Sequence, residues 1–401
     1  MASQTFLQSF IEQNYTKALN WLEFKHQQNL QSTNIYNSCD IRFAGFKMAN
    51  VDCNLFPAGF KNLSPQGIAN CQSQLLAFAK KHNLKQGSNL AIIAESHTRN
   101  IPYLHGVYII KQIFDSCGFN AQLATFDLKK FKLDLNEARL EVGKLTKQDG
   151  IIYIDGDFKP DFLVINNDMT VQSPPLLDDT KIKTFPKTEL GWHKRKKHDH
   201  FVKYQQIVND FCKDFNLDPW LLSAFFDECG SVDVQEDEGL DCLSDNVQRV
   251  IDKTIEKYKE YSLTLSPRVF VKANAGTYGM GVAMFEGADE VRQLNKKLRG
   301  KLDTVKAGTK STSFLVQEAV PSIELIDGSS AELVCYGFNS VPCDFFYRYH
   351  AEKDSNNSLN APGARFVNKG GFANPLDFKT NPLLASYFIV GSLAFLASGL
   401  E

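Results

Sequence analysis

A short apolar run that gives way to glycines is the feature that most constrains this chain. The segment Val269–Val282 reads VFVKANAGTYGMGV, in which a β-rich run ends at Lys272 and glycines follow at 276, 279 and 281. Glycines let backbone N–H groups approach phosphate oxygens closely, and a lysine on the preceding strand supplies a positive charge. The segment therefore predicts a strand and loop that bind a triphosphate. A Gly-rich hairpin with an incidental lysine is the alternative.

The spacing of these glycines excludes two familiar nucleotide-binding motifs. They follow G-x-x-G-x-G, and the chain contains neither a G-x-x-x-x-G-K-[ST] P-loop nor the H-R-D and D-F-G set of protein kinases. Farther along, the apolar run FLVQEAV carries Gln317 and Glu318, side chains suited to adenine or ribose. An edge strand with a solvated glutamate is the alternative there. The residues expected to contact ATP are Lys272, Gly276, Thr277, Gly279, Gly281, Gln317 and Glu318.

Composition and charge limit the class of protein. The 401 residues are 43% hydrophobic and 22% charged, enough for two or three packed domains, and a net charge of -2 does not suit a general nucleic-acid binder. Nine cysteines without a C-x-x-C pair indicate reduced thiols, and the N-terminus lacks a secretory pattern, so we expect a cytoplasmic protein. The uncharged run Leu383–Leu400 is diluted by Ser and Gly and has no basic flank, which favours a buried helix over a membrane span.

Apolar runs and turn signals divide the chain into four parts. Asn89–Ala94, a helix near Tyr103–Ser116 and Ala121–Phe126 predict a βαβ unit. Residues 166–185 are rich in Pro, Asp and Thr and are expected to form a linker, with helices after it and strands from Arg268 onward. The expected parts are a helical and metal- or substrate-loop segment at 1–88, a Rossmann-like substrate domain at 89–185, a helical segment with a basic cluster at 186–265, and a nucleotide-binding region at 266–401.

Five motifs in one order resemble the proteobacterial-type glutamate–cysteine ligases. They are VDCNLFPAGFKNL, AESHTRN, GWHKRKK, VKANAGTYGMG and SLNAPGARF. The resemblance implies an α/β and α+β fold of the ATP-grasp-like kind with an additional α/β substrate domain. It also implies an enzyme that joins glutamate to cysteine through an acyl phosphate, with ATP and a divalent metal, in the first step of glutathione synthesis. The chain departs from the family at Asn274, where an acidic residue is expected. A homo-oligomer is left open.

An acidic-x-Asn pair early in the chain is the predicted metal site. Asp52 and Asn54 point to the same face of an extended strand, and oxygen ligands of this type suit Mg²⁺, with Mn²⁺ as the other choice. The early position resembles the order in eukaryotic glutathione synthetases, so a permuted ATP-grasp arrangement is expected. Turn-capping side chains are the alternative. Glu332 is the expected third ligand.

Arginines in the matching motifs are the predicted carboxylate clamps, because a guanidinium can hold a carboxylate through two parallel hydrogen bonds. Arg348 and Asn360 resemble ATP-grasp positions that contact phosphate or the reacting carboxylate, and with Lys272 they are the predicted catalytic residues. The basic cluster His193–Lys197 is interpreted as a solvated face, and neutralisation of phosphates or attraction of anionic substrates is the alternative. The predicted substrate-binding residues are Arg42, Arg99, Asn100 and Arg365.

Two other functions are left open by the sequence. One is another ATP-grasp carboxylate–amine ligase, such as a glutathione-synthetase-like enzyme that joins different amino acids or peptides. The other is a nucleotide-binding regulator without chemistry. Release of phosphate across a panel of amino acids separates the three.

Overall fold

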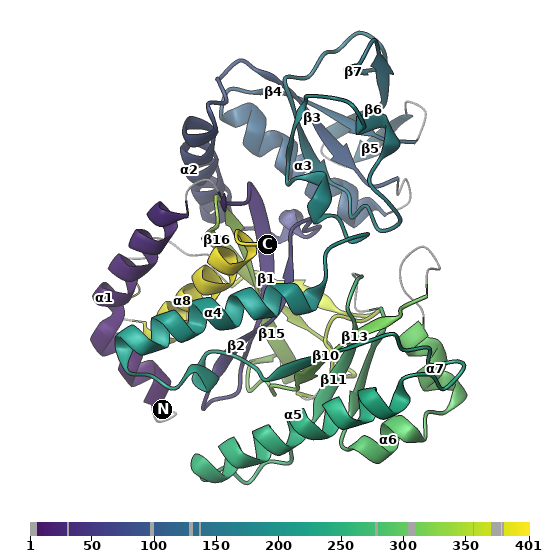
Figure 1. The fold of residues 1–401 in the computed structure, drawn as a ribbon. Helices are drawn as coiled ribbons and strands as arrows, with labels where there is room; N and C mark the ends of the chain where they lie inside the picture. The colour runs from purple at the N-terminus through teal and green to yellow at the C-terminus, as the bar shows by residue number, and fades with distance from the viewer. Residues whose placement is uncertain are drawn as a thin grey trace.

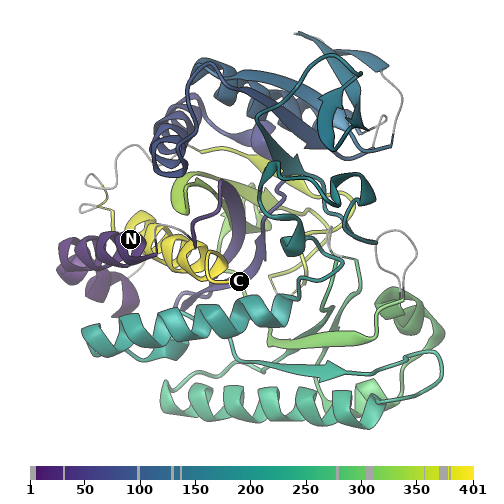
Figure 2. The ribbon, with the colours of Figure 1, turned by 45° about the horizontal axis from the view of Figure 1, so that its top comes forward.

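Three β-sheets organise the computed structural model (Figures 1 and 2). We call them the α/β sheet, which lies at the top of Figure 1, the central sheet in the middle, and the small sheet below it. The structure describes residues 6–29, 32–96, 100–127, 131–135, 138–276, 280–303, 310–355, 357–369, 378 and 381–401.

The α/β sheet has the strand order β5-β6-β4-β3-β8-β9, with β7 paired to β6. Strands β3 and β4 run parallel on either side of helix α3 in the chain, which confirms the predicted βαβ unit. Strand β9 lies in the stretch assigned to a linker, so that prediction is wrong for its three residues, which pair with β8 although they are too few and too polar to show a strand pattern. The strands are β3 (Asn89–Ala94), β4 (Asn120–Thr125), β5 (Phe131–Leu135), β6 (Ala138–Gln148), β7 (Ile151–Ile154), β8 (Phe162–Asn166) and β9 (Lys183–Phe185).

Two helices pack against this sheet and lead toward the central one. Helix α2 (Pro65–His82) and helix α3 (Ile101–Ser116) share a hydrophobic core with the α/β sheet and with one end of the central sheet. Ser64 caps α2 by accepting a hydrogen bond from the backbone N–H of Gly67, and Asn100 caps α3 in the same way through Tyr103. Short 3-10 turns connect the elements here and beyond, namely η2 (Phe60–Asn62), η3 (Pro175–Leu177), η4 (Thr188–Leu190) and η5 (Pro219–Leu221).

The central sheet joins strands from the two ends of the chain. Its order is β17-β16-β15-β1-β2, with β14 paired to β15, and its pairings are antiparallel. On β1, Cys39, Ile41 and Phe43 enter the core, whereas Asp40 and Arg42 face a cavity on the other side, as the two-residue period of a strand requires. The strands are β1 (Tyr36–Phe43), β2 (Met48–Asn54), β14 (Leu325–Ile326), β15 (Ser329–Phe338), β16 (Val341–Tyr349) and β17 (Arg365–Val367).

Three helices cover the core face of the central sheet: α1 (Phe6–Gln28), α4 (Lys197–Phe215) and α8 (Pro382–Ser398). Helix α8 lies against α1, α4 and strands β1, β2 and β16, and most of its length is buried. A helix that is apolar all round must be enclosed by protein, and here the prediction of a buried helix is confirmed. Among the described residues, no helix has the length and apolar character that crossing a bilayer requires.

The small sheet carries the Gly-rich segment. Its order is β10-β13-β11-β12, all antiparallel, and helices α5 (Leu240–Glu260), α6 (Ala288–Arg292) and α7 (Lys296–Asp303) pack on its core face. On β11, Val269 and Val271 enter that core, while Phe270 and Lys272 face the central sheet across a cavity. The strands are β10 (Phe226–Gly230), β11 (Val269–Ala273), β12 (Val282–Phe285) and β13 (Ser313–Glu318).

Strand β10 corrects the prediction that only helices occupy this part of the chain. Its sequence FDECG has one fully buried side chain, Cys229, so the sequence lacks the alternation of apolar and polar residues that predicts a strand. It forms because β13 offers an unpaired edge, along which Phe226 pairs with Gln317 and Gly230 with Ser313.

Candidate active site

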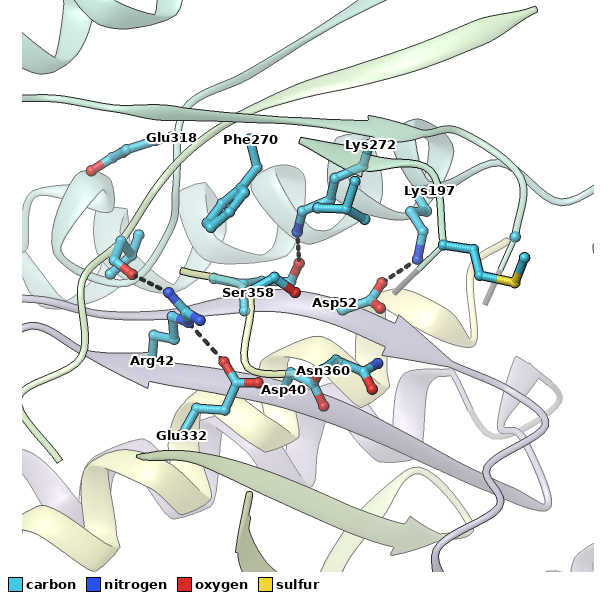
Figure 3. A pocket seen from close by; sticks show the side chains of 15 residues that line it. Asp40, Arg42, Asp52, Lys197, Phe270, Lys272, Glu318, Glu332, Ser358 and Asn360 are labelled. Atoms are coloured by element: carbon cyan, nitrogen blue, oxygen red, sulfur yellow. Dashed lines mark hydrogen bonds and ion pairs between the residues drawn. The ribbon is translucent and has the colours of Figure 1, made fainter. Parts of the chain in front are cut away.

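A cavity of about 50 Å³ lies between the central and small sheets (Figure 3). We call it the inter-sheet cavity. Its central-sheet wall is charged, with Asp40, Arg42, Asp52 and Glu332. Its small-sheet wall combines Lys272 with apolar side chains, namely Phe270, Val282 and, from the Gly-rich turn, Met280.

A second cavity of about 220 Å³ opens toward the α/β sheet. We call it the side cavity. Asn100 and Tyr103 of the α3 end contribute to its wall, as do Trp192, Arg348 and the aromatic ring of Phe346. Four residues line both cavities, and we call them the junction residues: Asp40, Asp52, Lys197 and Asn360. The two cavities therefore meet at a point that carries two carboxylates, an ammonium and an amide.

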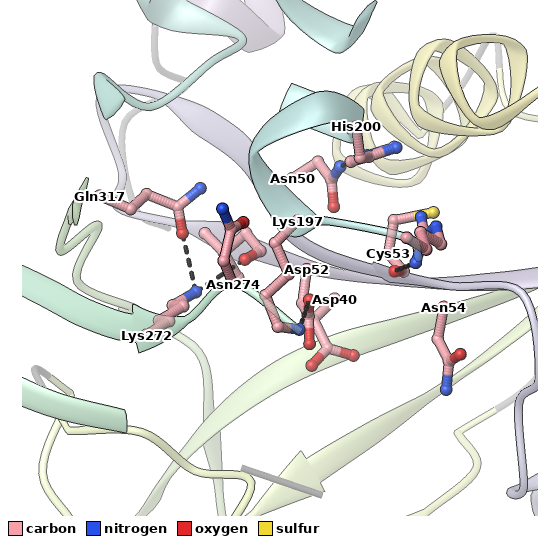
Figure 4. A network of polar contacts seen from close by, with 12 residues as sticks. Asp40, Asn50, Asp52, Cys53, Asn54, Lys197, His200, Lys272, Asn274 and Gln317 are labelled. Atoms are coloured by element: carbon pink, nitrogen blue, oxygen red, sulfur yellow. Dashed lines mark hydrogen bonds and ion pairs between the residues drawn. The ribbon is translucent and has the colours of Figure 1, made fainter. Parts of the chain in front are cut away.

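Lys272 projects from the small sheet toward strand β2 (Figures 3 and 4). Its Nζ donates hydrogen bonds to the carbonyl of Val51 at 2.8 Å and to Oε1 of Gln317 at 2.7 Å. Burial lowers the pKa of Lys272 to about 8, although the nearby Asp52 carboxylate opposes the shift. A buried cation that faces a cavity suits an anionic ligand, which would restore its charge.

The Gly-rich turn begins beside Lys272. Gly276 lines the inter-sheet cavity, and Gly281 has φ +64°, a left-handed conformation that glycine adopts without strain. The carbonyl of Gly281 accepts a hydrogen bond from the N–H of Ala273 at 2.7 Å, which closes the base of the turn. Thr277 and Gly279 lie outside the described residues.

Gln317 and Glu318 have different surroundings because they point to opposite faces of β13. The Gln317 side chain is buried and accepts from Lys272, and its Nε2 has no partner among the described residues. Glu318 accepts hydrogen bonds from Lys47, from the indole of Trp220 and from the backbone N–H of Phe225. Glu318 also lines the inter-sheet cavity, but its carboxylate is committed to this buried network. The alternative of a solvated glutamate is therefore wrong.

The predicted arginine clamps of the central sheet bind other parts of the protein. Arg42 Nε donates to Oε2 of Glu332 at 2.7 Å, and its other nitrogens donate to the carbonyls of Val320, Ser355 and Asn357. Arg348 donates to Oε1 of Glu332, also at 2.7 Å, and to both oxygens of Asp40.

These contacts make Asp40, Arg42, Glu332 and Arg348 a buried chain of alternating charge, which we call the central-sheet network. Burial raises the pKa of Glu332, but Arg42 and Arg348 outweigh that effect and hold it below its usual range. Burial raises the pKa of Asp40, and Arg348 offsets only part of the shift. Arg42 holds the carbonyls of the loop that leads to Asn360, so its visible role is to position that loop.

Asp52 lies directly opposite Asp40 in the β1–β2 pairing and binds Lys197 (Figure 4). The Lys197 Nζ to Asp52 Oδ1 distance is 2.6 Å. Burial raises the pKa of Asp52, but Lys197 and Lys272 more than compensate, so the pKa lies below its usual range. Asn54 lines the side cavity, and its Oδ1 accepts from the N–H of Phe56 at 2.9 Å. Asn54 thus shows the turn-capping contact that the sequence left as an alternative.

A buried group of charges holds Lys197 and strand β2 together. Glu401 accepts hydrogen bonds from Arg195 and His200, Arg195 also donates to the carbonyl of Cys53, and His200 contacts Asn50. Burial lowers the pKa of His200, but Cys53 and Glu401 outweigh it and raise the pKa to about 9. The interpretation of this basic cluster as a solvated face is therefore wrong for Arg195 and Lys197, which are buried.

The remaining predicted residues occupy different places. Asn100 caps α3 and lines the side cavity, and Asn360 is a junction residue. Arg365 is exposed on β17 and is absent from the described walls of both cavities. Arg99 lies outside the described residues. Asn274 donates to Glu228 and Ser313 and accepts from the N–H of His198, so it ties the Gly-rich segment to the start of α4.

Sequence reasoning did not select Asp40 as a site residue, and it considered Lys197 only as part of a basic cluster for which a solvated face was favoured. Asp40 alternates with Arg42 in the otherwise apolar run CDIRF, a spacing that places both on one face of a strand. Lys197 follows Trp192 closely in GWHKRKK, and an aromatic residue inside a basic cluster indicates packing rather than a solvated face.

The structure thus combines a mixed α/β fold with a cavity beside a Gly-rich turn and a second cavity that adjoins it. The family model for glutamate–cysteine ligase matches residues 8–401. The chain belongs to the glutamate–cysteine ligase family, whose members use ATP.

One solved structure agrees with this assignment, and two others resemble the chain only weakly. A protein from Methylobacillus flagellatus KT, named by inference a gamma-glutamylcysteine synthetase, has a TM-score of 0.86 and 30% identity over 98% of this chain and 95% of its own. A glutathione synthetase-like effector from Globodera pallida reaches a TM-score of 0.41 at 9% identity over 92% of this chain and 87% of its own. D-alanyl-alanine synthetase A from Vibrio cholerae reaches 0.26 at 11% identity over 71% and 74%. No curated protein matches the chain.

Proposed function

We propose that the ligation that defines this family, of glutamate to cysteine, takes place where the two cavities meet. The ATP phosphates occupy the inter-sheet cavity and the amino acids occupy the side cavity. The observation that carries the proposal is the set of four junction residues shared by both walls. A reaction that passes a phosphoryl group from nucleotide to amino acid requires such a shared point.

The nucleotide side is supported by the small sheet. Lys272 provides a buried positive charge next to Gly276, and the backbone of the Gly-rich turn can approach phosphates closely. Phe270 and Val282 form an apolar wall beside them, suited to the adenine ring. Gln317, whose Nε2 has no partner among the described residues, supplies a donor near the same wall.

The amino-acid side is supported by charge. The side cavity has the cations Lys61, Lys197 and Arg348, which outnumber its acids Asp40 and Asp52. That excess suits glutamate, which carries one net negative charge. We assign Asn100 and Asn360 to hydrogen bonds with substrate.

The chemistry has two steps that balance. An oxygen of the glutamate γ-carboxylate bonds to the γ-phosphorus of ATP while the bond from that phosphorus to ADP breaks. The amine nitrogen of cysteine then bonds to the γ-carbonyl carbon, phosphate leaves, and the amine loses a proton. Both steps depend on positioning and on neutralising phosphoryl oxygens rather than on a protein nucleophile.

The junction fits a magnesium ion that is shared with nucleotide phosphates. Mg²⁺ is commonly bound through one or two carboxylates together with substrate phosphates. Within the described parts of the chain, no three His, Cys, Asp or Glu side chains converge as a protein-only metal site. Asp52 is the carboxylate we assign to the ion, and Asn54 and Glu332 are weaker candidates because one caps a turn and the other binds two arginines. Bound there, the ion would neutralise phosphate charge.

The test is ATP-dependent phosphate release by purified protein across an amino-acid panel. We expect release with glutamate plus cysteine and a product with the mass of γ-glutamylcysteine. Preference for γ-glutamylcysteine plus glycine would favour a glutathione-synthetase-like enzyme. ATP binding without phosphate release for any pair would contradict an enzymatic role. A cytoplasmic location and a homo-oligomer stay predictions.

A further inference from the structure

We propose that Lys197 is a catalytic residue whose ammonium contacts the phosphoryl group during its transfer from ATP to the glutamate γ-carboxylate. The inference rests on the proposed function and assigns a role to one residue of a basic cluster for which the sequence favoured a solvated face.

The location of Lys197 is the first argument. Among the described residues, the inter-sheet cavity has the cations Arg42, Lys197 and Lys272, and the side cavity has Lys61, Lys197 and Arg348. Lys197 is the cation that the two walls share. A phosphoryl group in transit between the cavities must pass the junction, so Lys197 can neutralise it throughout the transfer.

The hydrogen bonds of the neighbouring cations are the second argument. Arg42 donates hydrogen bonds to Glu332 and to three backbone carbonyls, and Arg348 donates hydrogen bonds to Asp40 and Glu332. The Lys197 ammonium has three N–H donors, and its hydrogen-bond partner among the described residues is the single oxygen Oδ1 of Asp52. Lys197 therefore keeps donors for a ligand.

The anchoring of Lys197 is the third argument. Its Nζ lies 4.9 Å from the centroid of the Trp192 ring, which holds the side chain without using its hydrogen bonds. Its backbone N–H donates to the carbonyl of Asn274 at 2.8 Å, just before the Gly-rich turn. The lysine is thus tied to the segment that is proposed to hold the phosphates. It is also the first residue of the 19-residue helix α4, whose N-terminal end adds positive potential.

The negative charge that develops during phosphoryl transfer defines the role of the Lys197 ammonium. As the γ-carboxylate oxygen bonds to phosphorus and the bond to ADP breaks, negative charge spreads over the phosphoryl oxygens at the junction. An ammonium held beside them stabilises the transition state more than it stabilises bound ATP. Loss of Lys197 should therefore slow phosphoryl transfer without an equal loss of nucleotide affinity.

The experiment separates the first step by replacing cysteine with hydroxylamine, which traps the glutamyl phosphate as a hydroxamate. Lys197→Met is compared with Lys197→Arg and with Lys196→Met, a matched control because the neighbouring lysine is half exposed and pairs with Glu228. Binding of the non-hydrolysable analogue AMP-PNP is measured for each protein and also reports that the site is folded.

We expect Lys197→Met to lower hydroxamate formation roughly 100-fold or more while the Kd for AMP-PNP changes less than about fivefold. Lys197→Arg should recover part of the rate, and Lys196→Met should stay within about twofold of the original protein. Hydroxamate formation by Lys197→Met within about fivefold of the original would overturn the inference. An equal loss of rate and AMP-PNP affinity would also overturn it, because Lys197 would then serve ground-state binding. If the unaltered protein makes no hydroxamate from glutamate, the proposed function itself fails.

Discussion

The two walls of the inter-sheet cavity use charge in opposite ways. On the central sheet, the charged side chains bind one another, so most of their hydrogen-bonding groups already have protein partners; these residues are Asp40, Arg42, Glu332 and Arg348. On the small sheet, Lys272 has neutral partners, a carbonyl and an amide oxygen, and stands among apolar side chains. The comparison teaches that a charged residue in a cavity wall is a better candidate for ligand binding when the protein leaves some of its hydrogen-bonding groups without partners.

The difference has an energetic basis. Breaking a buried ion pair by removing one partner is costly, because the remaining charge is left uncompensated in a medium of low polarity. A buried lysine without a carboxylate partner avoids part of this cost because its lowered pKa allows it to lose its proton. Binding of an anion beside it then stabilises its charged form. We therefore expect changes in the central-sheet network to affect stability first, and changes at Lys272 to affect activity first.

The largest expected effect is at Lys272. Lys272→Met should lower turnover by roughly two to three orders of magnitude, the range seen when a single charge-stabilising donor is removed from an active site. The circular dichroism spectrum should be unchanged, because methionine fills a similar volume. Lys253→Met, at an exposed position of helix α5, is the control. Turnover by the Lys272 variant close to that of the control would remove Lys272 from the site.

The next effect is on stability, at the centre of the central-sheet network. Glu332→Gln keeps the shape but leaves Arg42 and Arg348 short of a negative charge, so the free energy of unfolding should fall by about 3–5 kcal/mol. Urea unfolding at neutral pH measures it. Asp245→Asn, which weakens an exposed pair with Arg292, should cost less than about 1 kcal/mol. Equal costs for the two variants would show that the network is not a structural unit.

Asp52 and Asn54 separate metal binding from turn capping. Asp52→Asn should weaken the apparent affinity for Mg²⁺ in the assay roughly ten- to hundredfold, a range found even for groups that only orient metal ligands. Asn54→Ala should leave metal dependence unchanged and cost about 1 kcal/mol of stability, because it loses the hydrogen bond to the N–H of Phe56. Metal titrations at saturating ATP decide between them. If Asn54→Ala weakens the apparent affinity for Mg²⁺ and Asp52→Asn does not, Asn54 rather than Asp52 binds the metal.

The pH dependence of activity should show an alkaline limb from Lys272. Its pKa is lowered to about 8, so above that pH the free protein loses the charge that binds phosphate, and kcat/KM should fall by up to about tenfold per pH unit. This group does not destabilise the fold there: the unfolded lysine keeps its proton until about pH 10.4, so its contribution to stability rises with pH. Lys272→Arg, which stays charged, should remove the limb in any residual activity. If Lys272→Arg shows an alkaline limb at the same pH, a group other than Lys272 causes that limb.

The smallest expected effect is at Arg365, which the sequence proposed for substrate binding. Its side chain is exposed on β17 and is absent from the described walls of both cavities, although the neighbouring Phe366 lines the side cavity, so Arg365→Ala should leave kcat and the KM for glutamate within about twofold. Its stability should change by less than about 0.5 kcal/mol. A tenfold rise in the KM for glutamate would restore Arg365 to the site.

Much of the local structure was predictable. The βαβ unit, the buried C-terminal helix and the strand before the glycines carry strong periodic or turn signals, and each appears in the structure, where that strand ends at Ala273 rather than at Lys272. Strand β10 and strand β9 were not predictable, because each is short and weakly apolar and forms by pairing with an edge that another part of the chain provides. For the site, the sequence selected Lys272, Asp52 and Asn360 but omitted Asp40 and Lys197.

The sequence by itself determined the strands and helices that carry strong periodic signals, the position of the Gly-rich turn, and the resemblance of the chain to a family of ligases. These properties follow from side-chain period, turn chemistry and motif order, all of which are local. Only the tertiary structure decided which charges neutralise one another. Arg348 meets Asp40 across 308 positions, and Lys197 meets Asp52 across 145. Such pairings arise because antiparallel strands and a helix start bring distant segments into register, and that register determines whether a charge in the cavity is left for a ligand.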